Sequence, residues 1–97
     1  MNVRAELPKL RAIGWSLWDP IGLLDKGEAW EPKRFADEYD DYLLHVAGHL
    51  QQGAPPEEMA SYLVAIERDF IGMGMQADTE IRAEATVEAI RAMQAQA

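Results

Sequence analysis

The chain has 97 residues, a length that suits one domain with one hydrophobic core. Hydrophobic residues make up 48% of the chain and charged residues 27%, a composition typical of folded proteins and not of disordered tails. Seventeen acidic and nine basic side chains give a formal net charge of −8, which disfavours direct binding to nucleic acids and to anionic lipids. The absence of cysteine excludes disulfides, thiolate chemistry and cysteine-based zinc sites.

The sequence also lacks the long apolar segments of membrane and exported proteins. Its longest apolar run falls far below the roughly 18 residues that a membrane span needs, and its first ten residues lack the apolar core of a signal peptide. We therefore expect a cytoplasmic protein, with one helical domain over residues 1–97 and no membrane contact. Residues 1–34 carry a net charge of +1 and residues 35–97 a net charge of −9, so the negative field belongs to the later helices.

The spacing of apolar residues predicts four helices, because strand signals are weak and the i, i+3, i+4, i+7 pattern recurs. In chain order these helices cover residues 3–15, 37–52, 56–71 and 78–97. Asp78 is the expected N-cap of the last helix, and the short link at residues 53–55 makes the second and third helices antiparallel. The predicted fold is all-α, a small four-helix bundle with an irregular connection between its first two helices.

Residues 16–34 connect the first two helices and are too many for a structureless loop in so small a domain. We expect residues 19–24 to form a single helical turn, with Asp19 as its N-cap and Pro20 in its first position. Trp18 and Trp30 should hold the rest of this connection against the bundle.

The helical spacing also predicts which side chains form the core. From the first three helices and the connection these are Leu10, Trp18, Ile21, Tyr39, Leu43, Val46, Leu50, Tyr62, Leu63, Ile66 and Phe70. The last helix is rich in alanine and presents a thin apolar face made of Ile81, Val87, Ile90 and Met93.

Three short motifs follow one another along the chain: Trp18-Asp19-Pro20-Ile21-Gly22, then Asp37-Glu38-Tyr39-Asp40-Asp41-Tyr42, then Tyr62-Leu63 with Ile66-Glu67. In this order, over about residues 13–73, the chain resembles a family of small all-helical bacterial proteins of unknown function. The resemblance implies an all-helical fold and an accessory or immunity-type role, with no established chemistry. The segment 24–34 is longer and more charged than the corresponding segment of that family. This difference affects the expected geometry of the loop and not the expected helices.

The Trp-Asp-Pro-Ile-Gly motif has a sufficient structural explanation. Asp19 would cap a helix, Pro20 would fix φ and Gly22 would allow a close approach, while Trp18 and Ile21 would fill the core. A functional interpretation would instead place Trp18 and Asp19 in a binding site. Caps and aromatic core residues are much commoner than sites, so the structural interpretation of this motif is favoured.

Acidic residues form two candidate surfaces for a partner. The first surface lies at the start of the second helix and consists of Asp37, Glu38, Asp40 and Asp41. The second follows a single stripe of the fourth helix, because residues four apart are neighbours on a helix, and consists of Glu80, Glu84 and Glu88. The first group is not a calcium loop, which needs oxygen ligands at alternating positions around a glycine. A basic partner would be attracted to these carboxylates. The alternative is that they only satisfy helix dipoles and keep the chain soluble.

His45 and His49 lie four residues apart on the second helix, a spacing that allows two imidazoles to share a metal ion. Glu38 and Asp41 fall on the same stripe. However, Val46 stands where a zinc-protease helix has its glutamate, and there is no third histidine. We therefore predict no cofactor and no tight metal site, with His49 at the edge of the apolar face and His45 further out.

Enzyme templates fail in this sequence. Its two serines have no neighbouring histidine, and Gly72-Met73-Gly74 ends a helix and does not cradle a phosphate. We predict a non-enzymatic acidic module that binds a basic protein partner, as immunity proteins and nucleic-acid-mimicking inhibitors do. Two alternatives stay open: a metal- or small-molecule-binding helical protein that uses His45 and His49, and a homo-oligomeric structural domain whose last helix packs against its copy.

Overall fold

The structure is a computed structural model that describes residues 3–25 and 27–96. Its elements in chain order are η1 (Val3–Glu6), α1 (Leu7–Ile13), η2 (Gly14–Trp18), α2 (Asp40–Gln51), α3 (Pro56–Ala65), η3 (Ile66–Phe70) and α4 (Thr79–Ala95). η1 is a 3-10 turn, whereas η2 and η3 are π-helical turns. The described residues contain four α-helices and no strand, which confirms the predicted all-α bundle. None of these helices combines the length and the apolar character that a membrane crossing requires.

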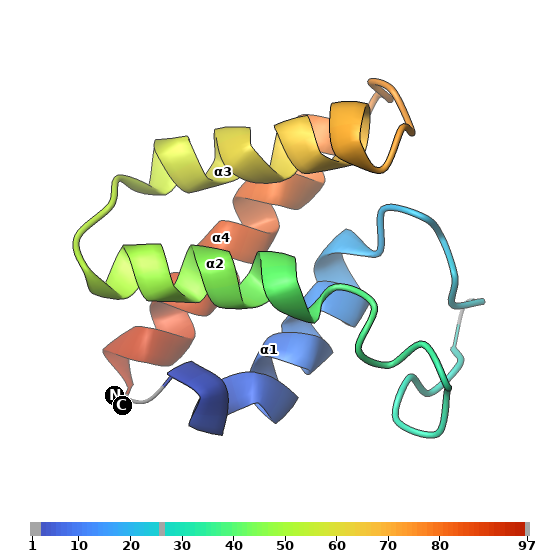
Figure 1. Cartoon of the computed structure of the whole chain (residues 1–97), viewed down its shortest axis with the longest axis horizontal. Coiled ribbons are helices and arrows are strands. Elements are labelled where there is room, and N and C mark those ends of the chain that lie inside the picture. Colours follow the sequence, from blue (N-terminus) through green and yellow to red (C-terminus); the bar gives the residue numbers. More distant parts are fainter. Residues whose placement is uncertain (1–2, 26, 97) are drawn as a thin grey trace.

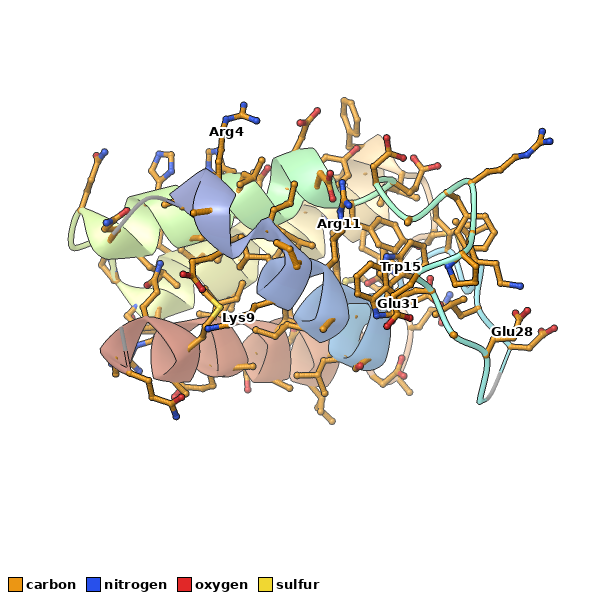
Figure 2. The ribbon with its side chains drawn as sticks, turned by 90° about the horizontal axis from the view of Figure 1, so that it is seen from below. Arg4, Lys9, Arg11, Trp15, Glu28 and Glu31 are labelled. Atoms are coloured by element: carbon orange, nitrogen blue, oxygen red, sulfur yellow. The ribbon has the colours of Figure 1, made fainter. Side chains whose placement is uncertain are left out.

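The helices form two layers. α2 and α3 lie side by side and run in opposite directions, and α4 crosses behind them (Figure 1). The view from below places α4 on one side of the molecule and α2 on the opposite side, with α1 running between them (Figure 2). α3 packs against α2 and also against α4, so it borders two different junctions between helices.

The first helical segment is longer than predicted, because η2 continues α1 as far as Trp18. It ends at Asp19, whose φ of 29° and ψ of 62° are left-handed, and Pro20 has no N–H with which to continue the helix. The predicted helical turn at residues 19–24 is wrong. The N–H of Gly22 donates to the Asp19 carbonyl at 3.0 Å and closes a tight turn instead, and an N-cap would need extended backbone at Asp19.

The second predicted helix also begins later than expected, at Asp40, because backbone hydrogen bonds three residues apart form turns over residues 33–40. An aromatic cluster holds this connection in place. The Trp15 ring lies 5.3 Å from Phe35 and 4.7 Å from Tyr39, and its indole N–H donates to a backbone carbonyl at 3.0 Å. Trp18 lies 5.3 Å from the same tyrosine ring. Two tryptophans of the first helical segment therefore anchor a long segment that has no α-helix of its own.

The predicted core is largely correct. Six of its residues are fully buried: Leu10, Trp18, Tyr39, Leu43, Val46 and Leu63. Three more are partly buried against them: Leu50, Tyr62 and Ile66. Three apolar predictions are wrong, since the exposed fraction is 38% for Ile21, 74% for Phe70 and 67% for Ile81.

Each of these errors has a local cause. Ile21 lies in the tight turn, where helical spacing does not apply. In η3 the N–H of Ile71 donates to the carbonyl of Ile66, five residues back, at 2.8 Å, and this wider turn breaks the spacing that assigned Phe70 to the core. Glu67 is buried in its place. Ile81 lies opposite the buried row of α4, which is made mainly of small residues: Thr79, Ala83, Thr86, Val87 and Ile90.

Candidate functional site

The Trp-Asp-Pro-Ile-Gly motif forms the interior of the turn that follows η2. The Asp19 carboxylate accepts the N–H groups of Leu23 and Leu24, both at 3.1 Å, and the hydroxyl of Tyr39 at 2.7 Å. Burial, and then the bond to this carboxylate, raise the pKa of Tyr39 well above its ordinary value. Gly22 has a φ of 71° and open space around it, so it serves the turn through its backbone conformation and not through a close approach.

Replacing Asp19 with alanine should therefore lower the free energy of unfolding by about 1–3 kcal/mol, because it leaves the buried Tyr39 hydroxyl and two backbone donors without their charged acceptor. Urea unfolding followed by circular dichroism measures this loss. Asp25→Ala is the matched control, since this exposed carboxylate forms no hydrogen bond with any other described residue, and it should change stability by less than about 0.5 kcal/mol. Equal unfolding midpoints for the two variants would contradict the role of Asp19.

A buried ion pair joins η2, η3 and α4. Glu67 is 0% exposed, and its two oxygens accept from Arg82 at 2.9 and 2.7 Å. Thr79 donates to the same carboxylate at 3.2 Å, and Arg82 also donates to the carbonyl of Trp18 at 3.0 Å. The bond to Glu67 is the largest cause of the raised pKa of Arg82. Because both oxygens of Glu67 are occupied by protein donors, this group holds three elements together and offers no free edge to a substrate.

Asp78, the predicted N-cap of α4, precedes that helix but makes no capping bond with its side chain. Its carboxylate lies 3.0 Å from the Nε of Arg82 instead, one turn further along the helix. The pKa of Asp78 is lowered, chiefly by this hydrogen bond. The side chain therefore extends the charge network at the start of α4, while the hydroxyl of Thr79 accepts the N–H of Gln76, in the segment before the helix, at 2.8 Å.

The acidic residues at the start of α2 do not form one surface. Arg11 reaches from α1 (Figure 2) and donates to both oxygens of Asp40, at 2.9 and 2.6 Å. The same arginine is also within the electrostatic reach of Asp37. Glu38 and Asp41 are exposed, and they act on the tyrosines of α2 and α3. The predicted acidic surface at the start of α2 is therefore not a single patch, because Arg11 of α1 pairs with Asp40 and neutralises its charge.

The two histidines form an aromatic stack. The His45 ring lies 4.0 Å from the rings of both His49 and Tyr62, at interplanar angles of 25° and 18°. His45 is half-buried and His49 is exposed, so the predicted order is reversed, because the ring of α3 covers the inner histidine. Burial, and then His49, lower the pKa of His45.

This stack does not suit a shared metal ion. A metal lies in the plane of each imidazole that binds it, and two nearly parallel planes 4.0 Å apart have no common position at bonding distance. The Nδ1 of His49 also lies at hydrogen-bond distance, 2.9 Å, from the carbonyl oxygen of His45. Among the described residues, no group of three or more histidine, aspartate or glutamate side chains is placed to hold a metal. The absence of a tight zinc site stays a prediction.

The stripe of glutamates on α4 lines a groove between α3 and α4, with a volume of about 610 Å³. Glu80, Glu84 and Glu88 form its rim on α4, and Glu57 lies on the α3 side. The other lining residues are Pro56, Ala60, Ser61, Val64, Arg68 and Val87. The groove therefore has a small apolar floor and an acidic rim, which we call the acidic groove.

Most of the carboxylates of the acidic groove are free of partners. Glu88 lies 2.8 Å from Arg91, whereas Glu57, Glu80 and Glu84 form no ion pair with any described residue. The one arginine that lines the groove, Arg68, is bonded to Asp69 at 2.7 Å. The groove therefore has an excess of negative charge. A cation that entered it could bind most of its carboxylates without breaking an existing ion pair.

A second cavity, of about 750 Å³, lies between η1, the end of α2 and the end of α4. Its lining carries one charge of each sign, Glu6 and Arg91, together with the amides of Gln51 and Gln94. None of the residues that the sequence predicted for a site lies in it. The described part of this cavity thus has no charge preference that would select a ligand class.

Comparison with known proteins adds no relative: no family model, no curated protein and no solved structure matches this chain.

Proposed function

We propose that this protein is a non-enzymatic binding module of the cytoplasm whose acidic groove accepts a basic segment of another protein. The observation that carries this proposal is the combination of an apolar floor with a rim of glutamates, most of them unpaired. Interfaces commonly pair an apolar centre with complementary charges at the rim. An immunity-type or inhibitory role against a basic enzyme would use the same chemistry.

The dimensions of the groove suit an amphipathic helix. Glu80, Glu84 and Glu88 are one helical turn apart and extend over about 12 Å of α4, since each residue adds 1.5 Å. A partner helix lying along the groove would present lysines or arginines at a similar spacing. Its apolar side chains would contact Ala60 and Val64, the partly exposed apolar residues of the floor, in the manner of an amphipathic helix bound in a groove.

The same electrostatics argue for a partner other than a second copy. Neighbouring like charges on a helix surface repel by a few tenths of a kcal/mol per pair, and a basic ligand relieves this repulsion. A second copy would bring a further net charge of −8 towards the groove. We therefore propose a basic hetero-partner, whose approach the field of the protein accelerates.

The test uses a synthetic helical peptide with a leucine stripe flanked by lysine and arginine. The triple variant Glu80→Gln, Glu84→Gln, Glu88→Gln should bind it about ten-fold more weakly than the unchanged protein in low salt, because three rim charges are lost. Isothermal titration calorimetry gives the dissociation constants. Raising the ionic strength to 0.15 M shortens the screening length to about 8 Å and should weaken binding by the unchanged protein most.

A second triple variant, Asp25→Asn, Glu31→Gln, Asp37→Asn, is the matched control, since it removes the same net charge from exposed positions outside the groove. It should retain most of the affinity. A control peptide with glutamine in place of lysine and arginine should not bind measurably. If the two triple variants bind equally, or if affinity does not depend on salt, the acidic groove is not the site.

A further inference from the structure

A second surface of different chemistry lies on the other flank of α3. Five aromatic side chains line the junction of α2 with α3 and η3 in two contacting groups, and we call them the aromatic strip: His49, His45 and Tyr62, and Tyr42 and Phe70. Three of the rings stack at centroid distances of 4.0 Å. The Phe70 ring packs edge-on at 6.1 Å from the Tyr42 ring, which in turn packs edge-on at 6.0 Å from the buried Trp18.

The outer end of the strip is open. Phe70 is 74% exposed, although a phenylalanine gains free energy when it is buried. It stands on η3, the turn in which Glu67 occupies the core position, so the fold leaves the phenylalanine ring outside. Its neighbour Tyr42 is only partly covered. This ring therefore contributes little to the core, and its faces are available to a partner.

Two carboxylates lie beside the strip without partners of their own. Glu38 and Asp41 are exposed and form no ion pair within the described part of the chain. Both act on Tyr42, whose pKa is raised first by burial and then by these charges. Arg11 pairs with the neighbouring carboxylate of Asp40 and with neither of these two. The strip is therefore a π surface with an unneutralised negative border.

We propose that the aromatic strip binds arginine side chains from an extended segment of a partner protein. A guanidinium group is planar and weakly hydrated, so it stacks on aromatic faces better than an ammonium group does. The stack would use the exposed faces at Phe70 and Tyr42, while Glu38 and Asp41 accept the guanidinium N–H groups. The surface is distinct from the acidic groove, and this proposal does not depend on the proposed function of that groove.

The experiment uses a capped glycine-rich hexapeptide with two arginines, together with the same peptide carrying citrulline at both positions. Citrulline keeps the planar shape but lacks the charge. Titration of the protein, followed by amide chemical shifts at pH 7.5, should show changes at residues 38–45 and 62–70 with the arginine peptide and much smaller ones with citrulline. Phe70→Leu, which keeps an apolar side chain but removes the ring, should weaken binding about two- to five-fold.

Ile81→Ala is the matched control, because it shortens an equally exposed apolar side chain on α4 and should leave affinity unchanged. The variant Glu38→Gln, Asp41→Asn should reduce the shift changes at residues 38–45 and 62–70, whereas Asp25→Asn, Glu31→Gln, which removes the same charge from outside both surfaces, should not. Equal binding of the citrulline peptide would overturn the proposal, and so would an unchanged affinity of Phe70→Leu. Shift changes concentrated along α4 would also overturn it and would place the arginines in the acidic groove.

Discussion

Replacing Arg82 with leucine should lower the free energy of unfolding by about 3–5 kcal/mol, the largest effect that we expect from a single polar side chain. The substitution leaves the carboxylate of Glu67, which is 0% exposed, without its cation, and it removes the donor to the Trp18 carbonyl. A buried charge without a partner costs several kcal/mol, and a domain of this size has about 5–15 kcal/mol in total.

Urea unfolding followed by circular dichroism measures this effect, with Arg91→Leu as the control. Arg91 forms an exposed pair with Glu88, so its loss should cost less than about 1 kcal/mol. The double variant Glu67→Leu, Arg82→Leu should recover part of the loss, because no unpaired charge stays buried. Similar losses for Arg82→Leu and Arg91→Leu would contradict the structural role of the buried pair.

Leu63→Ala should cost about 2–5 kcal/mol, because the side chain is completely buried in α3 and its removal leaves a cavity. For a domain of this length each kcal/mol lowers the melting temperature by roughly 4–8 °C, so thermal unfolding resolves the effect easily. Ile66→Ala is the internal comparison. Its side chain is only partly buried against the core, and we expect a loss of at most about 2 kcal/mol. A larger loss at Ile66 than at Leu63 would mean that α3 has another orientation.

The helices could be predicted from the sequence because each one has its own apolar periodicity, which is a local property. The connection could not. Its shape depends on the left-handed backbone of Asp19. It also depends on the contacts of the Trp15 ring with Phe35 and Tyr39, which are both far from Trp15 in the chain. The π-helical turn η3 could not be predicted either, since nothing in the spacing of residues 62–70 distinguishes it from an α-helix. That turn explains why Phe70 is outside and Glu67 inside.

The candidate sites show the same division between local and distant information. The stripe of Glu80, Glu84 and Glu88 follows from spacing along one helix, so the sequence could identify it. The opposite rim at Glu57 and the apolar floor exist only because α3 packs on α4. Likewise, the pairing of Asp40 with Arg11 spans 29 positions, and no local sequence pattern predicts it.

Two residues of the three sequence motifs, Asp19 and Glu67, take part in contacts between elements. Asp19 binds the hydroxyl of Tyr39, and Glu67 binds Arg82. These motif residues therefore hold the bundle together, while the proposed partner surfaces are formed mainly by other residues.

The contact between Arg82 and the Trp18 carbonyl joins residues 64 positions apart. The α2–α3 hairpin needs only a short link to form, whereas this contact closes a loop that includes nearly two thirds of the chain, at a larger cost in chain entropy. We therefore expect this contact to form in a late step of folding, after the hairpin is in place. Interactions that form after the transition state slow unfolding and leave the folding rate almost unchanged. The contact between Arg82 and the Trp18 carbonyl should thus lengthen the lifetime of the folded state and do little to speed its formation.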